Sequence, residues 1–397
     1  MCIPNSRAPV RSDARCLVCG RQDTERLLEW DGPALTSLCT LEDQVTVVRR
    51  CEACTHVQTQ PMDDLAAYYS RHYRILLDSE EEDQIYRVSG GRTVYRADHQ
   101  ADVLLATTAI PDGASVLDYG AAKSTTMRRV LTQRPDVDLH LFDVSEMYIE
   151  YWERFVDADH WACFDIPAKW HERFDLVSSF FMLEHADDPT ASVRAMAELL
   201  QEGGHLHLVI PNPLVNVGDM VVVDHVNHFT APSLHRLLTD AGLTVELLSD
   251  SHHDGAWVAV GRRGGKGARA VDVPDRASAI DGVDAVARYW SGIDATIALM
   301  EEAAEGNDVA IYGAGFYGSL LFSRLAHPDR VRAFVDRNQF LQGREHLGRP
   351  VVAPDALERD VAHVLVGLNP SIARSAMADV DAFADRDIYM HFMDASS

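Results

Sequence analysis

Two parts of the chain alternate short apolar runs with longer stretches of helical composition. β-type runs occur at residues 115–118, 139–143, 174–178 and 205–210, and again at 309–312, 331–335 and 363–366. Apolar runs of about 4–8 residues are typical of buried strands, and strands that alternate with helices build a parallel sheet covered on both faces. The pattern therefore predicts two α/β units, and the second repeats the alternation of strands and helices seen in the first.

Segments of other composition surround these two units. We expect a cysteine-bearing module at 1–62, a charged and aromatic connector at 63–100, the first α/β unit at 101–263, a linker with a helix at 264–305, and the second α/β unit at 306–397. A chain of 397 residues exceeds what one hydrophobic core usually organises. The acidic run at 79–83, inside the connector, predicts the solvated start of a helix.

Two Cys-x-x-Cys pairs stand in the N-terminal module: Cys16 with Cys19, and Cys51 with Cys54. Each pair places two thiolates on one tight turn, so two pairs can present four sulfurs tetrahedrally to one zinc ion. Disulfides and thiols without a role are the alternatives. Disulfides are disfavoured because the chain has only seven cysteines and four of them stand in these two pairs. Because all four ligands come from the protein, we expect a structural rather than a catalytic zinc.

Charge and hydropathy argue against several classes of partner. The formal net charge is −25 and no basic patch is visible, which disfavours nucleic acid because its phosphates would be repelled. No apolar run approaches the roughly 20 residues that span a bilayer, and the first residues, MCIPNS, do not have the pattern of a signal peptide. With free thiols in addition, we expect a cytoplasmic protein, a monomer or homodimer, that acts on a small molecule and not on a membrane.

The loop after the first strand of the first α/β unit suggests a cofactor site. It reads DYGAAKS at 118–124 and opens a helix, where backbone amides and a helix N-terminus meet a ligand. About 20 residues further on, the second strand ends at Asp143, and an acid at that place can accept both hydroxyls of a ribose. The residues expected around the cofactor are Asp118, Tyr119, Gly120, Ala121, Ala122, Ser124, Asp143, Val144, Asp165, Phe181 and Glu184.

These features resemble the class I methyltransferases that depend on S-adenosylmethionine (SAM). Members share a DxGxGxG loop, an acid after the second strand and a segment of the form LLxxGG, which residues 199–204 match as LLQEGG. The chain departs from the family at Ala122 and Ser124, where glycine is usual, although both residues are small. A nicotinamide-binding unit is disfavoured here because this unit has no GxGxxG sequence.

The order of the domains narrows the resemblance to the sugar C-methyltransferases that act on nucleotide-linked keto sugars. That family combines an N-terminal zinc module, a central methyltransferase domain and a C-terminal Rossmann-like domain, so the resemblance covers nearly the whole chain. The local match is VVDHVNHFT at 222–230, where the family has a Tyr-x-Glu-His element whose His handles the proton lost beside a ketone. Val222 and Asp224 replace the Tyr and the Glu, so transfer to oxygen or nitrogen stays open.

Methyl transfer from SAM requires alignment of the reacting atoms and removal of a proton, and neutral imidazole suits that removal near neutral pH. His225 is favoured as the base because Asp224 is adjacent; His185 and His228 are the alternatives, and 18 histidines offer others by chance. The resemblance also implies that Tyr69 or Tyr73, in a region that caps the pocket of the similar enzymes, reaches the site. Packing is the alternative role for both tyrosines.

The second α/β unit has a glycine loop of its own, formed by Gly313, Gly315 and Gly318, with Asp336 ending the next strand. This GxGxxG spacing, with an acid about 20 residues on, is the dinucleotide fingerprint and taken alone predicts NAD. In the resembling family the equivalent domain anchors substrate and is not an active dehydrogenase, and no Tyr-x-x-x-Lys follows the loop here. We therefore favour a substrate-nucleotide or structural role over dinucleotide binding.

These observations predict an α/β enzyme that uses SAM and a structural zinc to methylate a nucleotide-linked sugar destined for an antibiotic or a surface glycan. One alternative is a binding or assembly subunit whose altered loop no longer supports transfer. The other is an NAD-dependent sugar oxidoreductase that works through the C-terminal glycine loop.

Overall fold

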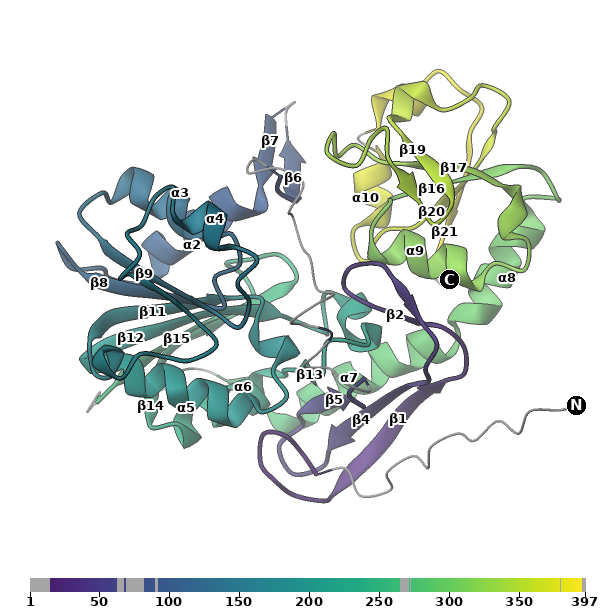
Figure 1. Ribbon diagram of the computed structural model, residues 1–397. Coiled ribbons are helices and arrows are strands. Elements are labelled where there is room, and N and C mark those ends of the chain that lie inside the picture. Colours follow the sequence, from purple (N-terminus) through teal and green to yellow (C-terminus); the bar gives the residue numbers. More distant parts are fainter. Residues whose placement is uncertain are drawn as a thin grey trace, which may run out of the picture.

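The computed structural model contains three domains, and the second and third are joined by a pair of helices (Figure 1). The chain is described at residues 15–62, 68, 82–89, 92–264, 271, 273–378 and 380–394. Tyr69, Tyr73 and residues 79–81 of the acidic run lie outside these ranges. The rest of that run is buried, not solvated as predicted, because Asp83 accepts the backbone N–H groups of Gln84 and Ala97 ahead of the next helix.

The N-terminal module is built on an antiparallel sheet in the order β1-β4-β5-β13. Its own strands are β1 (Thr24–Trp30), β4 (Thr46–Cys51) and β5 (Val57–Thr59), and the fourth is β13 (Asn227–His228) from the middle of the chain. There are also two small antiparallel hairpins. Strand β2 (Ala34–Leu35) pairs with β3 (Leu41–Glu42), and β6 (Ile85–Ser89) pairs with β7 (Arg92–Tyr95). The module is thus joined to the central domain through a shared sheet.

The central domain is a seven-stranded sheet in the order β10-β9-β8-β11-β12-β15-β14. The strands are β8 (Ser115–Tyr119), β9 (Asp138–Asp143), β10 (Trp161–Cys163), β11 (Phe174–Phe180), β12 (Leu200–Pro211), β14 (Leu243–Ser249) and β15 (Ala256–Arg263). The first five are parallel, while β15 runs antiparallel to both β12 and β14. This is the doubly wound order, in which a ligand binds where the connections change direction, between β8 and β11.

Helices cover the sheet on both faces, as the alternating pattern predicted (Figure 1). They are α2 (Arg96–Thr107), α3 (Thr125–Gln133), α4 (Ile149–Trp152), α5 (Pro189–Leu199) and α6 (Ala231–Asp240), with 3-10 turns η2 (Ala168–Trp170), η3 (Leu183–His185) and η4 (Val217–Val221). Fully buried large side chains, among them Trp152, Trp170 and Phe174, fill the space between helices and sheet. Apolar burial of this kind is the main source of stability of such a domain.

The C-terminal domain repeats the same winding on a smaller scale, in the order β18-β19-β17-β16-β20-β21. Its elements are β16 (Val309–Tyr312), α9 (Phe316–Arg324), η5 (Pro328–Arg330), β17 (Val331–Val335), β18 (Glu345–His346), β19 (Arg349–Val352), η6 (Pro354–Ala356), β20 (His363–Val366), α10 (Ala373–Ala378), η7 (Asp381–Phe383) and β21 (Tyr389–Phe392). Strands β16, β17 and β20 coincide with the three predicted apolar runs.

The helices α7 (Arg276–Ser291) and α8 (Ile293–Ala303) connect the last two domains and pack against the rest of the protein. The indole N–H of Trp290 donates to the carbonyl of Val217 in η4 at 2.7 Å. The guanidinium of Arg50, from β4, pairs with Asp284 on α7. These contacts fix α7 against both the central domain and the N-terminal module.

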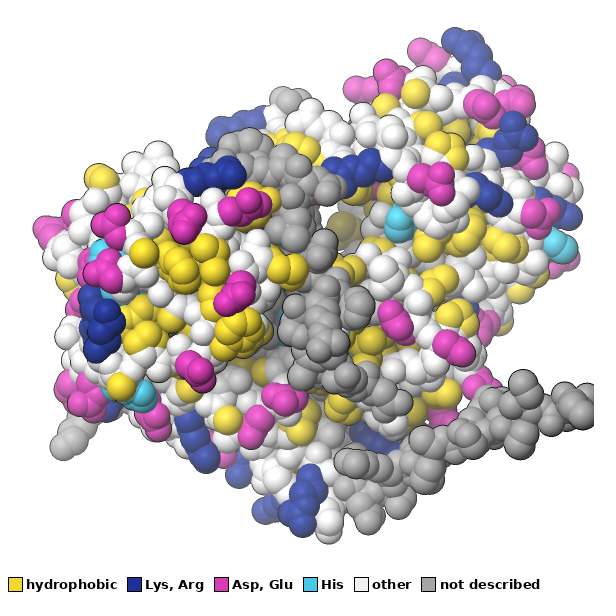
Figure 2. Space-filling model, in the orientation of Figure 1, with side chains coloured by type: hydrophobic (Ala, Val, Ile, Leu, Met, Phe, Trp, Pro, Cys, Tyr) yellow, Lys and Arg dark blue, Asp and Glu magenta, His cyan; other side chains and the backbone are white. Residues whose placement is uncertain are grey.

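Charged side chains of both signs lie on the surface seen in Figure 2. On the face seen in Figure 2, basic and acidic side chains are scattered, and the basic ones form no continuous stripe over the described residues. None of the helices in the described part of the chain combines the length and the apolar character needed to cross a bilayer.

Candidate functional site

One large cavity, of about 1320 Å³, lies among the three domains. The central domain contributes the loop at 118–124, the N-terminal module contributes residues 37–39, and the C-terminal domain contributes residues 314–317. In Figure 1 the β2 hairpin rises toward α9 between the other two domains. The predicted cofactor loop and the second glycine loop therefore open onto the same space.

The loop after β8 is a tight turn held by backbone hydrogen bonds. The N–H groups of Gly120 and Ala121 both donate to the carbonyl of Phe142, at 2.8 and 3.0 Å. Gly120 has φ +76°, and a Cβ at this position would come within 2.5 Å of Cγ of Met182. Glycine is required here for both reasons.

Ala122 and Ser124, at the positions where the resembled family has glycine, also adopt left-handed backbone conformations. Their φ angles are +44° and +53°. The Ala122 N–H donates to the Asp143 carboxylate at 2.9 Å, and the Ser124 hydroxyl donates to Asp118 at 2.6 Å. The loop thus keeps the glycine-type conformation without glycine, at a conformational cost of about 1 kcal/mol or more for each residue.

Asp143 ends β9 at the edge of the cavity and is only 8 % exposed. Burial raises its pKa to about 6, against the opposing backbone hydrogen bonds from Ala122 and Ser145. Val144 and Phe164 beside it line the cavity and are each 54 % exposed, which is unusual for large apolar side chains. A carboxylate flanked by apolar faces suits a ribose with its attached base.

Most, but not all, of the predicted cofactor residues line this cavity. Asp118, Tyr119, Gly120, Ala121, Ala122, Ser124, Asp143, Val144, Phe181 and Glu184 do so. Asp165 does not: its side chain is exposed after β10, and its neighbour Phe164 faces the cavity instead. The left-handed conformation of Phe164, with φ +64°, gives the physical reason, because it turns the chain just before Asp165.

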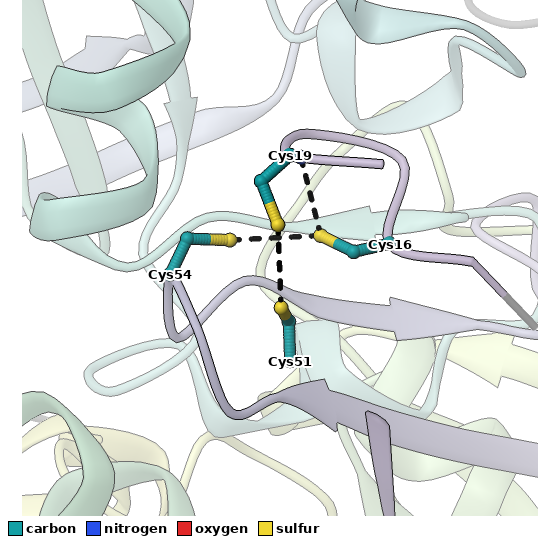
Figure 3. Close-up of side chains that lie close together, drawn as sticks. All are labelled: Cys16, Cys19, Cys51 and Cys54. Carbon is teal, nitrogen blue, oxygen red and sulfur yellow. Dashed lines mark hydrogen bonds between the residues drawn. The ribbon is translucent and has the colours of Figure 1, made fainter. Parts of the chain in front are cut away.

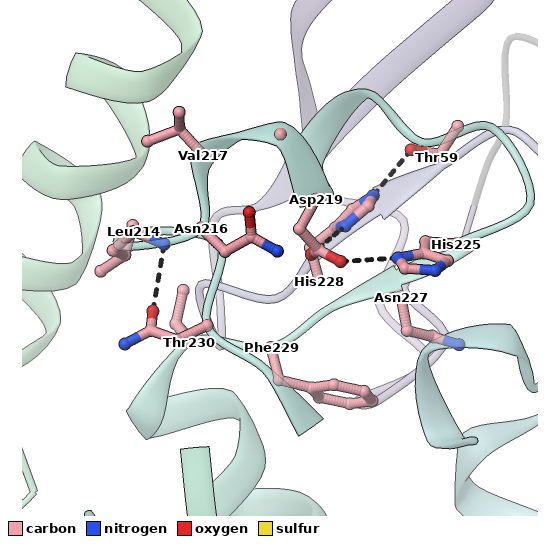
Figure 4. Close-up of polar contacts among 12 residues, drawn as sticks. Thr59, Leu214, Asn216, Val217, Asp219, His225, Asn227, His228, Phe229 and Thr230 are labelled. Atoms are coloured by element: carbon pink, nitrogen blue, oxygen red, sulfur yellow. Dashed lines mark hydrogen bonds and ion pairs between the residues drawn. The ribbon is translucent and has the colours of Figure 1, made fainter. Parts of the chain in front are cut away.

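Asp219 of η4 holds the two histidines of the VVDHVNHFT segment (Figure 4). His225 donates from Nδ1 to Asp219 Oδ1 at 2.6 Å, and His228 donates from Nδ1 to Oδ2 at 2.8 Å. The Asp219 side chain is fully buried. This carboxylate, and not the adjacent Asp224, is therefore the group that orients His225.

The same contacts determine the protonation of this cluster. Burial alone would lower the pKa of His225, but the hydrogen bond and charge of Asp219, helped by Asp224 and Glu184, outweigh it and raise the pKa to about 9. Burial would raise the pKa of Asp219, but the attraction of His228 and the two hydrogen bonds hold it well below its usual range. Both shifts favour the charged forms of His225 and Asp219.

Asp224, predicted to assist His225, faces the N-terminal module. Its two carboxylate oxygens accept the backbone N–H and the hydroxyl of Ser37, each at 2.7 Å. The hydrogen bonds of this carboxylate thus go to Ser37, and Asp224 acts on His225 through its charge alone, which helps raise the pKa of His225. Asp224 instead fixes the loop at 37–39 that forms one wall of the cavity.

His185 and Glu184 of η3 lie on the other side of His225. The rings of His185 and His225 meet edge to face with centroids 4.6 Å apart, and Nδ1 of His185 faces the carbonyl of Asp224 at 3.3 Å. Burial lowers the pKa of His185 to about 4 and raises that of Glu184 to about 7. Oε2 of Glu184 is buried without a hydrogen-bond partner among the described residues.

His228 was a third candidate for the base, and the structure gives it a supporting position. Its Nδ1 bonds Asp219, and its Nε2 lies 2.8 Å from the hydroxyl of Thr59 on β5 (Figure 4). The side chain is fully buried and does not line the cavity. His228 therefore fixes Asp219 and does not reach a substrate.

The four cysteines of the N-terminal module converge as the spacing predicted (Figure 3). Sγ of Cys16 lies 3.5 Å from that of Cys54, and Sγ of Cys19 lies 3.5 Å from that of Cys51. All four sulfurs lie within 4.8 Å of one another, and the described cysteines are free thiols. Sulfurs bound to zinc at about 2.3 Å lie within such distances of each other, so the cluster is compatible with a zinc ion.

Comparison with known proteins gives the central domain its class. Residues 94–248 match the family described as "Methyltransferase domain". Among curated proteins, the ubiquinone biosynthesis O-methyltransferase of Xanthomonas axonopodis pv. citri is 33 % identical over 158 residues, which cover 35 % of this chain and 66 % of that protein. The ubiquinone biosynthesis O-methyltransferase of Xanthomonas oryzae pv. oryzae is 38 % identical over 101 residues, which cover 24 % of this chain and 42 % of that protein.

Residues 94–248 are a class I, SAM-dependent methyltransferase domain. The chain spans less than two thirds of the length of the curated relatives that it matches. Among solved structures, a SAM-dependent methyltransferase from Mesorhizobium loti has a TM-score of 0.35 at 14 % identity and covers 42 % of this chain and 98 % of its own. One from Aquifex aeolicus has a TM-score of 0.34 at 13 % identity, covering 41 % and 88 %.

The C-terminal glycine loop meets the methyltransferase domain at η4. The hydroxyl of Tyr317 accepts the N–H of Gly218 at 2.7 Å and donates to Asn216 at 3.0 Å. Of the four residues predicted for a second nucleotide, Gly315 lines the cavity, whereas Gly313, Gly318 and Asp336 do not. A Cβ on Gly318 would come within 1.9 Å of the Gly313 carbonyl, so Gly318 serves the close packing of helix on loop.

Three residues of the site escaped prediction from the sequence. Asp219 and Ser37 lack any motif and are revealed by their partners His225 and Asp224. Lys123 could have been found from the sequence, because a lysine among the small residues of the cofactor loop is unusual enough to suggest a role in the site. It lines the cavity, and its ammonium donates to the carbonyl of Glu82 at 3.0 Å.

Proposed function

We propose that the protein is a SAM-dependent methyltransferase that acts on a nucleotide-linked sugar. The observation that carries this proposal is the single cavity lined by both glycine loops. In this proposal SAM binds at the methyltransferase loop, and residues 314–317 form a second, distinct surface for the substrate. A substrate with a nucleotide at one end and a sugar at the other would reach from the second loop to the histidines.

The residues around the first loop fit SAM. Asp143 would accept the ribose hydroxyls, and Val144 and Phe164 would cover the adenine. SAM, when bound, supplies the activated methyl group, so the protein has to align the acceptor and remove its proton. The N–H groups of Gly120 and Ala121 are used within the loop itself and maintain its shape.

We propose His225 as the group that removes the proton. With Nδ1–H donated to Asp219, Nε2 of the neutral ring is the nitrogen that can accept a proton. Because the pKa of His225 is raised to about 9, the neutral ring gains population, and turnover should rise, as the pH increases toward that value. The imidazolium that forms would be stabilised by Asp219, which His228 and Thr59 hold in place. Glu184, His185 and Val222 would shape the surrounding wall.

The names of the relatives support transfer to oxygen as a second possibility for the acceptor atom. Both are O-methyltransferases, and Val222 stands where the sugar C-methyltransferases have tyrosine. Carbon methylation beside a ketone requires an enolate, so the enzyme should then exchange deuterium from heavy water into that carbon. Methyl transfer without exchange would favour an oxygen or nitrogen acceptor.

The four-cysteine cluster is proposed to hold a structural zinc. All ligands are protein thiols, so no position is left for water or substrate. We also propose a reducing, cytoplasmic setting, because the described cysteines form no disulfide with one another.

The central experiment is turnover with candidate nucleotide sugars and SAM labelled in the methyl group. His225→Ala should lower turnover by about 100-fold or more with SAM affinity retained, the usual scale for a lost base. Failure to bind SAM in calorimetry would favour the assembly-subunit alternative. A saturable NADH fluorescence change with no methyl transfer would favour the oxidoreductase.

A further inference from the structure

Glu184, His185 and His225 form a second cluster of metal-ligating groups, apart from the cysteines. One nitrogen or oxygen from each lies within 4.8 Å of the others, and all three residues line the cavity. Two imidazoles and one carboxylate are a donor set typical of divalent transition metals in enzymes. Atoms about 2 Å from a common cation lie within about 4 Å of each other, so small side-chain rotations bring these donors into range.

The surroundings of the cluster are those of a metal site. His225 donates its Nδ1–H to the buried carboxylate of Asp219, and Nδ1 of His185 faces the Asp224 carbonyl. Metal-binding histidines almost always make such a contact through one ring nitrogen, which fixes the ring and leaves the other nitrogen as donor. In His225 the nitrogen left for a metal is then Nε2.

Glu184 supplies the independent observation. Its side chain is 1 % exposed, and Oε2 has no hydrogen-bond partner among the described residues. An unsatisfied buried carboxylate oxygen is costly, and a cation would satisfy it. We infer that Glu184, His185 and His225 bind a divalent first-row transition-metal cation, such as Zn²⁺ or Co²⁺, in the cavity.

A comparable cluster at Asp138, His140 and His160 does not support the same inference. The guanidinium of Arg173 lies 3.2 Å from Asp138 and already neutralises its carboxylate. That cluster therefore serves as an internal control.

The inference does not depend on methyl transfer, but it has a consequence for it. A cation and a proton would compete for the same Nε2 of His225. In the metal-loaded protein His225 is a ligand and not a base.

The test is the metal stoichiometry of full-length protein equilibrated with Co²⁺ and freed of unbound metal. Wild type should hold two ions, one with the intense thiolate absorption of the cysteine cluster and one without it. Glu184→Gln and His185→Asn should each lose the second ion and keep the thiolate band, which also reports that they are folded. Asp219→Asn should weaken the second site by about 10–100-fold, as expected for a group that orients a ligand.

His160→Asn is the matched control and should retain both ions. A second ion that persists in both Glu184→Gln and His185→Asn, or disappears in His160→Asn, overturns the inference. So does a wild-type protein that holds cobalt on its thiolates alone. If the site binds Zn²⁺ without slowing methyl transfer, the cation site stands and His225 is not the base.

Discussion

Asp219 and His225 are joined by a 2.6 Å hydrogen bond inside the cavity wall, six residues apart in sequence. In the proposed reaction Asp219 is a positioning residue, so Asp219→Asn should lower kcat by about 100-fold or more while SAM affinity and the acceptor KM change little. Asp224→Asn is the control, since its carboxylate contacts Ser37. Steady-state kinetics would contradict the assignment if Asp224→Asn were the more damaging of the two.

The cofactor loop predicts opposite effects at two neighbouring positions. Ala122→Gly relieves a left-handed alanine and should raise the free energy of unfolding by about 1 kcal/mol with SAM affinity unchanged. Gly120→Ala should destabilise the protein and weaken SAM binding, because its Cβ would meet Met182. Chemical denaturation and calorimetry measure both effects. Equal behaviour of the two variants would mean that the backbone of this loop is not as described.

SAM affinity should depend on pH through Asp143. Burial raises the pKa of this carboxyl to about 6, and the proposed ribose hydroxyls donate to the ionised form. Affinity should therefore fall as the pH drops through about 6 and level off above it, and Asp143→Asn should bind weakly at every pH without this dependence. Asp118, whose pKa burial raises to about 7, also titrates nearby. In Asp118→Asn, calorimetry should still show the fall in SAM affinity near pH 6 that is due to Asp143.

Removing the proposed zinc should destabilise more than the N-terminal module. The carbonyl of Leu17 accepts the hydroxyl of Thr190 on α5, and Thr55 shares a hydrogen bond with Thr230. We therefore expect about one zinc per chain by elemental analysis, and a lower Tm together with loss of SAM binding after chelation or in Cys16→Ser. Cys163→Ser, outside the cluster, should do neither. A chelated protein with unchanged Tm would remove the structural role.

Tyr317 predicts how the C-terminal domain supports the site. Tyr317→Phe loses two hydrogen bonds to the 216–218 segment and should lower the free energy of unfolding by about 1–3 kcal/mol. Tyr312→Phe is the matched control, because the Tyr312 hydroxyl is buried without a partner among the described residues. This change should leave the free energy of unfolding unchanged or raise it. Thermal unfolding of the two variants, compared with their acceptor KM, separates the contributions to stability and to substrate binding.

The fold and the cofactor loop were predictable because their signals are local. The apolar runs of the sequence coincide with β16, β17 and β20. The spacing of the two cysteine pairs correctly predicted that four sulfurs lie together. The partner of His225 was not predictable in this way. Sequence adjacency favoured Asp224, whereas the Asp224 carboxylate is hydrogen-bonded to Ser37 and the 3-10 turn η4 brings Asp219 to the imidazole.

Burial was the other effect that local patterns missed. The run at 79–83 looks solvated by composition, yet Glu82 and Asp83 are enclosed where three domains meet. The exposure of Asp165 and of its neighbour Phe164 likewise depends on one left-handed residue that no periodicity marks. Long-range contacts, more than local preference, decide which of these side chains face the cavity.

The pairing of β13 with β5 limits how this protein can be dissected or recombined. A truncation at the predicted boundary after residue 62 would strip Asn227 and His228 of their only sheet neighbour in the described residues and remove Thr59 from His228. The excised methyltransferase portion would then lose the strand that supports the segment carrying His225. Exchange of acceptor specificity between relatives should therefore succeed by transplanting the N-terminal module and residues 216–230 together, and fail when either is moved alone.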